Sequence, residues 1–262
     1  MKKLTLQSNA KVNLSLDILG REEKEGRFKG YHFVQSVIHE ITPQNTHGFE
    51  SDEITIEIEE AKETTIAIKC NNPKVPTDKT NLAYQATTLV LERFKTEPLK
   101  ITITINKKIP LSSGLGGGAS NAAAIIRALK VLLGLKISTE EMRLIAAEVG
   151  MDVPFFVEGG LALAEHYGEQ ITLLPPVNGM AFTLSPKESD LETKTEEFYS
   201  KIDLQKCGKN VAQTISLIHS IKTNDYLKMH EFLHNDFETI LKTPLPKNHH
   251  LSGAGPTTFI LA

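Results

Sequence analysis

The sequence predicts an α+β fold divided into two domains. In the first half, patterns with the period of a strand or of a helix follow in the order strand, hairpin, helix, strand, helix. This order differs from the regular strand and helix alternation of a doubly wound sheet. A length of 262 residues allows one large domain or two modest ones. Beyond residue 159 the patterns weaken and prolines interrupt them, so we expect a first domain over 1–158 and a second over 159–262.

The composition favours a small charged ligand over a polymer or a membrane. The chain has 29 basic and 32 acidic residues, a net charge of -3, and no basic stripe. No apolar run follows the initial Met-Lys-Lys as in a signal peptide, and no stretch is long enough to span a bilayer. The cysteines and histidines lack metal-ligand or disulfide spacing. We therefore expect a cytoplasmic protein without a structural metal and without a nucleic-acid or membrane partner; the sequence does not predict its oligomeric state.

The first predicted element is a strand over residues 6–19. Apolar residues alternate with polar ones along it, and the polar set is Lys11, Asn13, Ser15 and Asp17. Such alternation is typical of a half-buried strand, because successive side chains point to opposite faces. Its polar face either presents Lys11 and Asn13 to a ligand or merely faces water.

Three further elements follow before residue 106. Residues 53–59 and 64–69 alternate in the same way around a short polar turn and predict a hairpin. Residues 81–94 carry apolar side chains at helical spacing, and 101–105 alternate again. We therefore expect a helix and one more strand, which leads into a glycine-rich loop.

The loop reads I-P-L-S-S-G-L-G-G-G-A-S-N-A-A and starts at Ile109. Glycine permits the positive φ that turns several N–H groups inward, and the helix that follows, up to Gly134, adds its free N–H groups and dipole. The pattern therefore predicts an anion site, with a flexible turn before a core helix as the alternative. The Walker motif is excluded because no lysine follows Gly118, and the dinucleotide fingerprint lacks its acidic residue at a strand end.

After the loop helix, Ser138 and Glu141 fit a capping box that opens a further helix to about Val149, with Leu144, Ile145 and Val149 facing inward. Asp152 then stands in the apolar run G-M-D-V-P-F-F-V. A carboxylate that is buried without a partner is costly, so Asp152 should have either a functional role or a capping role.

Three motifs, in this order, resemble those of the GHMP kinases, and within them the kinases of diphosphocytidyl-methylerythritol. They are A-K-V-N-L-S-L followed by G-Y-H, P-x-x-x-G-L-G-G-G-x-S-N-A-A, and S-G-A-G-P-T-T-F. The resemblance covers nearly the whole chain, although the insert at 21–29 is longer than the family's. It implies the two-domain GHMP kinase fold, with an N-terminal ATP-binding domain of the ribosomal protein S5 domain 2 type and a C-terminal substrate-binding domain.

The resemblance also implies an activity: transfer of the γ-phosphate of ATP to the 2-hydroxyl of 4-diphosphocytidyl-2-C-methyl-D-erythritol, on the non-mevalonate route to isoprenoids. Mg²⁺ would be bound through the nucleotide. In the segment that resembles G-A-D-V-P-F-F, Asp152 would be the catalytic base. Lys11 would keep it ionised and neutralise growing charge, as phosphoryl transfer requires.

The remaining implied positions bind the two substrates. Asn13 would approach the reacting hydroxyl, Tyr31 and Tyr199 would cover the two faces of the cytosine, and His32 would hydrogen-bond it. The ATP-binding positions are Asn81 in the adenine-side loop V-P-T-D-K-T-N-L-A, Pro110, Gly114, Leu115, Gly116, Gly117, Gly118 and Ser120, where Ser120 could touch the metal.

Two alternatives remain open. One is a GHMP kinase that acts on another small alcohol without a nucleobase, against which Tyr31 and His32 argue. The other is a nucleotide-binding protein without catalysis, which is disfavoured because both Lys11 and Asp152 are present.

Overall fold

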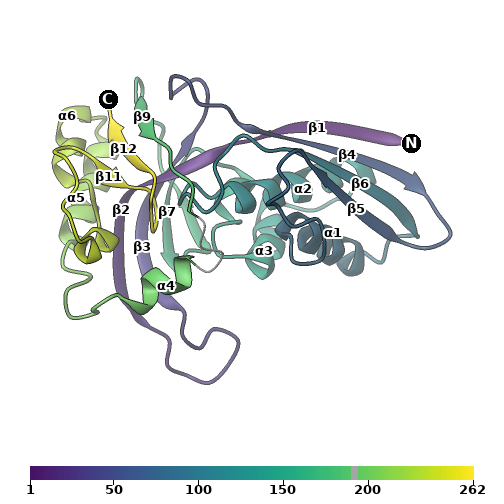
Figure 1. The fold of residues 1–262 in the computed structure, drawn as a ribbon, viewed down its shortest axis with the longest axis horizontal. Coiled ribbons are helices and arrows are strands. Elements are labelled where there is room, and N and C mark those ends of the chain that lie inside the picture. Colours follow the sequence, from purple (N-terminus) through teal and green to yellow (C-terminus); the bar gives the residue numbers. More distant parts are fainter. Residues whose placement is uncertain (190–193) are drawn as a thin grey trace. The chain divides into compact units, whose positions relative to one another are not determined.

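The computed structural model describes residues 1–189 and 194–262, and the chain forms two compact units (Figure 1). Unit 1 comprises Met1–Ala10, Glu50–Ile109 and Gly116–Glu158, and unit 2 comprises Lys11–Phe49, Pro110–Leu115 and Gly159–Ala262. The expected boundary at 158/159 is therefore one of the points where the chain passes between units. Unit 2 also takes in two earlier segments, 11–49 and 110–115.

Unit 1 is built on a four-stranded sheet with the order β1-β4-β6-β5. The strands are β1 (Lys2–Ser8), β4 (Asp52–Glu60), β5 (Thr65–Cys70) and β6 (Leu99–Asn106). Three helices lie together on one side of this sheet, as Figure 1 shows: α1 (Leu82–Arg93), α2 (Gly117–Leu133) and α3 (Thr139–Val149). A short 3-10 helix, η1 (Phe155–Val157), follows α3. Strands and helices occur where the periodicity predicts them, and the α+β class is confirmed.

The predicted hairpin is wrong in its pairing. β4 and β5 exist, but β6 lies between them, antiparallel to β4 and parallel to β5. The central position of β6 buries its three isoleucines, which are at most 1% exposed. A strand that offers this much apolar surface is more stable between two neighbours than at an edge, because both neighbours shield it from water.

The predicted strand over 6–19 is two strands with a break at Asn9. β1 pairs with β4 in unit 1, whereas β2 (Ala10–Arg21) pairs with β3 in the sheet of unit 2.

The predicted start of α3 and the predicted end of α2 are confirmed. Ser138 and Glu141 form the capping box of α3, and α2 ends at Gly134 with φ +65°. Of the residues expected to face inward, Ile145 is fully buried and Val149 is half-buried, whereas Leu144 is 56% exposed and Met142 is buried in its place. The prediction is therefore confirmed for Ile145 and wrong for Leu144.

Unit 2 contains two sheets. The five-stranded sheet has the order β10-β2-β3-β7-β8 and the three-stranded sheet the order β11-β12-β9. Its strands beyond β2 are β3 (His32–Ile41), β7 (Leu161–His166), β8 (Gln170–Leu173), β9 (Phe182–Ser185), β10 (His234–Asn235), β11 (His250–Leu251) and β12 (Thr258–Leu261). Its helices are α4 (Lys194–Ser200), α5 (Val211–Lys222), α6 (Tyr226–Met229), η2 (His230–Phe232) and η3 (Asp236–Ile240).

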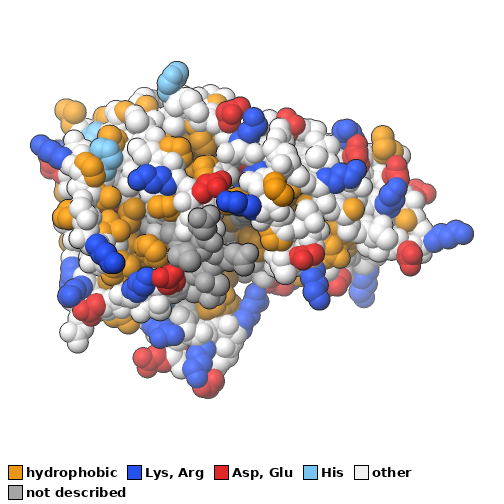
Figure 2. Space-filling view, viewed as in Figure 1, with side chains coloured by type: hydrophobic (Ala, Val, Ile, Leu, Met, Phe, Trp, Pro, Cys, Tyr) orange, Lys and Arg blue, Asp and Glu red, His pale blue; other side chains and the backbone are white. Residues whose placement is uncertain are grey.

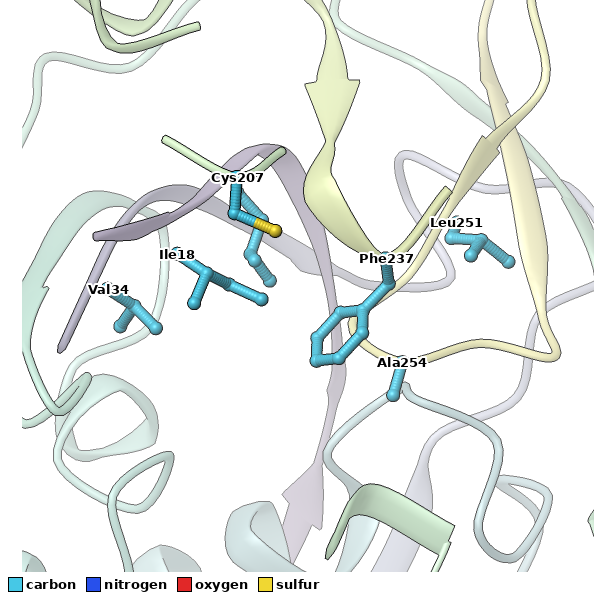
Figure 3. Packing of buried hydrophobic residues seen from close by; sticks show 7 residues of the cluster. Ile18, Val34, Cys207, Phe237, Leu251 and Ala254 are labelled. Atoms are coloured by element: carbon cyan, nitrogen blue, oxygen red, sulfur yellow. The ribbon is translucent and has the colours of Figure 1, made fainter. Parts of the chain in front are cut away.

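A small apolar cluster joins distant segments of unit 2. Figure 3 shows Ile18 and Val34 from the five-stranded sheet near Cys207, Phe237 and Leu251, which come from much later in the chain. Phe237 is 1% exposed. Burial of such side chains stabilises the contact by roughly 1.5–3 kcal/mol each, so the cluster holds the C-terminal segment against β2 and β3.

The surface agrees with the balanced composition. On the face drawn in Figure 2, basic and acidic side chains are interspersed. Among the described residues, none of the helices has both the length and the apolar character needed to cross a membrane.

Candidate active site

The polar side of β2 is buried. Lys11 and Asn13 are each 4% exposed, and Ser15 and Asp17 are fully covered. The expectation of a half-buried strand is therefore wrong, as is the alternative that these side chains face water. Polar groups are buried in this way only when they find hydrogen-bond partners inside the protein. The partners of these side chains therefore indicate the role of β2.

Asn13 holds the ammonium group of Lys11. Asn13 Oδ1 accepts a hydrogen bond from Lys11 Nζ at 2.5 Å and another from the backbone N–H of Gly253 at 2.9 Å. On its other side, Asn13 Nδ2 donates to Ser36 Oγ at 2.8 Å. The side chain of Asn13 is thus fixed from three directions, and it fixes the cationic end of Lys11 beside the Gly253 turn.

The last motif of the sequence packs against the first half of the glycine loop. Ser252 Oγ lies within donor distance of two carbonyl oxygens, Lys11 O at 3.0 Å and Gly114 O at 2.9 Å. The backbone N–H of Lys11 donates to Leu115 O at 2.9 Å. Ser252 therefore ties the β2 motif to the loop, a role that the sequence indicated only through the place of this serine in S-G-A-G-P.

Gly114 is required by this packing. Its φ is +84°, and a Cβ added to it would lie 2.0 Å from Ser252 O and 2.9 Å from Gly255 O. No side chain fits there unless the C-terminal turn moves. Parts of all three motifs from the sequence analysis therefore meet within unit 2, through hydrogen bonds of both backbone and side-chain groups.

The second half of the glycine loop opens α2 in unit 1. Gly116 is the N-cap, in the left-handed region with φ +72°, and no side chain caps the helix. Gly118 is exposed and Gly117 partly so. The first N–H groups of a helix have no intrahelical partner, and together with the dipole they attract an anion.

Three other predicted ATP-binding residues have structural contacts of their own. Ser120 is 1% exposed and accepts a hydrogen bond from Ser8 Oγ at 2.8 Å. Pro110 O accepts from Ser113 Oγ at 2.8 Å, which shapes the loop. Asn81 is the N-cap of α1, and its Oδ1 accepts from Ala83 N at 2.9 Å.

Asp152 lies in an exposed turn between α3 and η1, whereas residues 153–157 are buried. The argument from burial is therefore wrong for this residue, because a hydrated carboxylate has no desolvation penalty to offset. The capping alternative is not supported either, since η1 has Pro154 at its N-cap and no side-chain cap bond. Asp152 is an accessible carboxylate in unit 1.

The predicted cytosine-binding residues lie around the start of β3. Tyr31 is 43% exposed, and its ring centroid is 5.6 Å from that of Tyr167. His32 is stacked on Tyr199, with centroids 4.4 Å apart and 20° between the planes. Burial, and then the charge of Arg21, lower the pKa of His32, so its ring is neutral at pH 7.

The insert at 21–29 continues the hairpin between β2 and β3. Glu22 N donates to Tyr31 O at 2.7 Å, and Gly30 N donates to Glu22 O at 2.8 Å. The hydroxyl of Tyr167 donates to Glu22 Oε2 at 3.0 Å. These bonds fix the base of the insert next to Tyr31 and His32.

Several known proteins with similar sequences or structures are kinases. The family model for the GHMP kinases N terminal domain matches residues 81–160. The 4-diphosphocytidyl-2-C-methyl-D-erythritol kinase of Nostoc punctiforme is 34% identical over 292 residues, an alignment that spans 100% of this chain and 87% of that relative. A crystal structure of 4-(cytidine 5'-diphospho)-2C-methyl-D-erythritol kinase matches with a TM-score of 0.69 at 25% identity, over 99% of this chain and 90% of that one. A crystal structure of homoserine kinase from Cytophaga hutchinsonii has a TM-score of 0.74 at 20% identity, over 100% of this chain and 85% of that one. It shares the fold.

Proposed function

Because this chain belongs to the 4-diphosphocytidyl-2-C-methyl-D-erythritol kinase family, we propose that ATP binds at its glycine loop and that the joined motifs of unit 2 serve phosphoryl transfer. The reaction moves the γ-phosphate of ATP to the 2-hydroxyl of 4-diphosphocytidyl-2-C-methyl-D-erythritol, in the non-mevalonate route to isoprenoids. The observation that carries the proposal is the fixed Lys11 ammonium, held by Asn13 beside the turn that covers Gly114.

In this proposal ATP is held mainly by backbone groups. The uncapped start of α2 at Gly116 offers N–H groups to the phosphates, which a loop without the Walker lysine needs. Pro110, Leu115 and Ser120 shape the loop, and Asn81 fixes the start of α1 on the adenine side.

Mg²⁺ brought in with the nucleotide would supply positive charge that offsets the charge developing during phosphoryl transfer. Among the described residues, no cluster of three or more His, Cys, Asp or Glu side chains is placed to hold a metal ion by itself. Because the hydroxyl of Ser120 meets that of Ser8, we assign Ser120 to the support of the loop.

Asp152 and Lys11 have separate roles in the reaction. Asp152 takes the proton from the 2-hydroxyl as its oxygen forms a bond to the γ-phosphorus, and the bond between that phosphorus and the β,γ-bridging oxygen breaks to release ADP. Lys11 neutralises the charge on the transferred group. Its exposure of only 4% places the ammonium in surroundings where charge interactions are stronger than in water.

Recognition of the cytidine end falls to Tyr31, His32 and Tyr199, with Asn13 near the acceptor hydroxyl. A neutral His32 has one nitrogen that donates and one that accepts, and hydrogen bonds can distinguish cytosine from uracil where stacking cannot. The acceptor is a small water-soluble molecule, and we propose a cytoplasmic reaction in which neither a nucleic acid nor a membrane takes part.

The test is ADP release from ATP·Mg with three separate acceptors: 4-diphosphocytidyl-2-C-methyl-D-erythritol, homoserine and mevalonate. We expect turnover with the first only. Turnover with homoserine or mevalonate at a higher kcat/KM would favour a different GHMP small-molecule kinase. ATP binding without turnover of any acceptor would favour a nucleotide-binding protein without catalysis.

A further inference from the structure

Asp52, the first residue of β4, is a fully buried carboxylate in unit 1 that the proposed chemistry does not use. Its Oδ1 accepts hydrogen bonds from the backbone N–H groups of Lys108 at 2.7 Å and Ile109 at 2.8 Å. Its Oδ2 accepts from Asn121 Nδ2 at 2.9 Å and from the ammonium of Lys107. The buried charge is therefore compensated by four donors.

These donors lie on both sides of the glycine loop. Lys107, Lys108 and Ile109 are the residues that lead from β6 into the loop, and Asn121 lies on α2 just after it. The ammonium of Lys107 also lies against the start of α2, because a Cβ added to Gly117 would be 2.7 Å from Lys107 Nζ. One carboxylate thus holds the chain where it enters the loop and where it leaves.

The network continues to the helix itself. Asn121 Nδ2 also lies 2.9 Å from Ser8 Oγ, and Ser8 Oγ donates to Ser120 Oγ. Lys107 is 5% exposed in its side chain. The cluster is therefore a buried polar network beneath the first turn of α2.

We propose that Asp52 is a positioning residue for ATP: by holding both ends of the glycine loop, it fixes the N–H groups at the start of α2 that receive the phosphates. This inference rests on the proposed function only in that ATP binds at this loop. Phosphoryl transfer depends largely on positioning, and a displacement of about 1 Å can cost about a hundredfold in rate.

The test compares Asp52→Asn with a matched control on the same strand. Asp52→Asn keeps the size of the side chain and an oxygen for Lys108 and Ile109, but its amide N–H₂ then faces the ammonium of Lys107. The control is Glu59→Gln, the same chemical change at the other end of β4, where an exposed carboxylate pairs with Lys100 at 3.4 Å.

The readout is the equilibrium affinity for ATP·Mg by calorimetry, followed by the KM for each substrate. We expect Asp52→Asn to weaken ATP binding about tenfold or more and to leave the KM for the cytidine substrate within about twofold, whereas Glu59→Gln changes neither. A residue with a merely structural role would lower the melting temperature and the active fraction, but not the ATP affinity of the folded protein. Folded Asp52→Asn with the parent's ATP affinity overturns the proposal.

A second variant covers the case in which Asp52→Asn does not fold. Asp52→Asn combined with Lys107→Met removes both buried charges, so no charge is left unpaired. We expect it to fold and still to bind ATP more weakly than the parent; parental affinity would overturn the proposal. If the parent binds ATP but does not phosphorylate the cytidine substrate, the proposed reaction fails, and the affinity ratios still decide the role of Asp52.

Discussion

Replacement of Gly114 by alanine tests whether the C-terminal turn and the glycine loop are packed as the structure has them. The added Cβ would lie 2.0 Å from Ser252 O, well inside the ordinary contact distance, and the φ of +84° is one that alanine rarely adopts. Because the nearest atom is a backbone carbonyl, a flexible side chain cannot relieve the clash. The turn itself must move.

The magnitude follows from two contributions. An alanine in the left-handed region costs about 1–2 kcal/mol. Moving the turn disturbs the bonds from Ser252 Oγ to Gly114 O and from Thr257 N to Ser113 O, each worth about 1 kcal/mol. The sum of about 3–4 kcal/mol corresponds to a loss of about 6–16 °C in melting temperature for a chain of this size.

Gly118→Ala is the matched control, made four residues later in the same loop. Its added Cβ would meet only Leu82 Cδ1, at 3.8 Å, and its φ lies outside the left-handed region. Alanine is favoured over glycine in a helix by about 0.5–1 kcal/mol, so this variant should melt at or slightly above the parent temperature. The measurement is thermal unfolding by circular dichroism without nucleotide. Melting temperatures of the two variants within about 1 °C of each other, less than the shift expected from 1 kcal/mol, would refute the packing argument.

Three further outcomes are expected. Asp152→Asn removes the proton acceptor and should lower turnover at saturating substrates by about 10²–10⁴-fold, with little change in ATP affinity. A folded variant whose turnover is within about threefold of the parent's, far short of that loss, would exclude Asp152 as the base. His32→Ala should lose more of the preference for cytidine over uridine than Tyr199→Ala, and a parent without that preference would contradict the cytosine assignment. Burial lowers the pKa of His234, but its hydrogen bond to Asp17 at 3.1 Å and the nearby carboxylate charges outweigh burial, so the pKa is raised above 6.5. Its stabilising effect should therefore be complete below pH 6.5 and decline as the pH rises through the raised pKa, measured as a shrinking gap in melting temperature between the parent and His234→Gln.

The sequence alone determined the elements with strong periodicity, the helix caps and the turns that require a glycine. The isoleucines of β6, the capping box at Ser138 and the glycine that ends α2 lie where the pattern predicted them. These features depend on interactions between residues a few positions apart, so they can be inferred from spacing. The motifs around Lys11, Gly114 and Ser252 likewise indicated a kinase of this family before their geometry was known.

Only the tertiary structure decided how these elements combine. Periodicity tells which side chains share a face, but not what covers that face. The polar side of β2 is therefore buried against Ser36 and the Gly253 turn, although its alternation is typical of a half-buried strand. An apolar run says equally little about one polar residue inside it, and Asp152 is exposed while its neighbours are buried. Strand pairing, too, depends on contacts between residues far apart in the chain. For this reason β6 lies between β4 and β5, which we had predicted to pair because they are neighbours in the sequence.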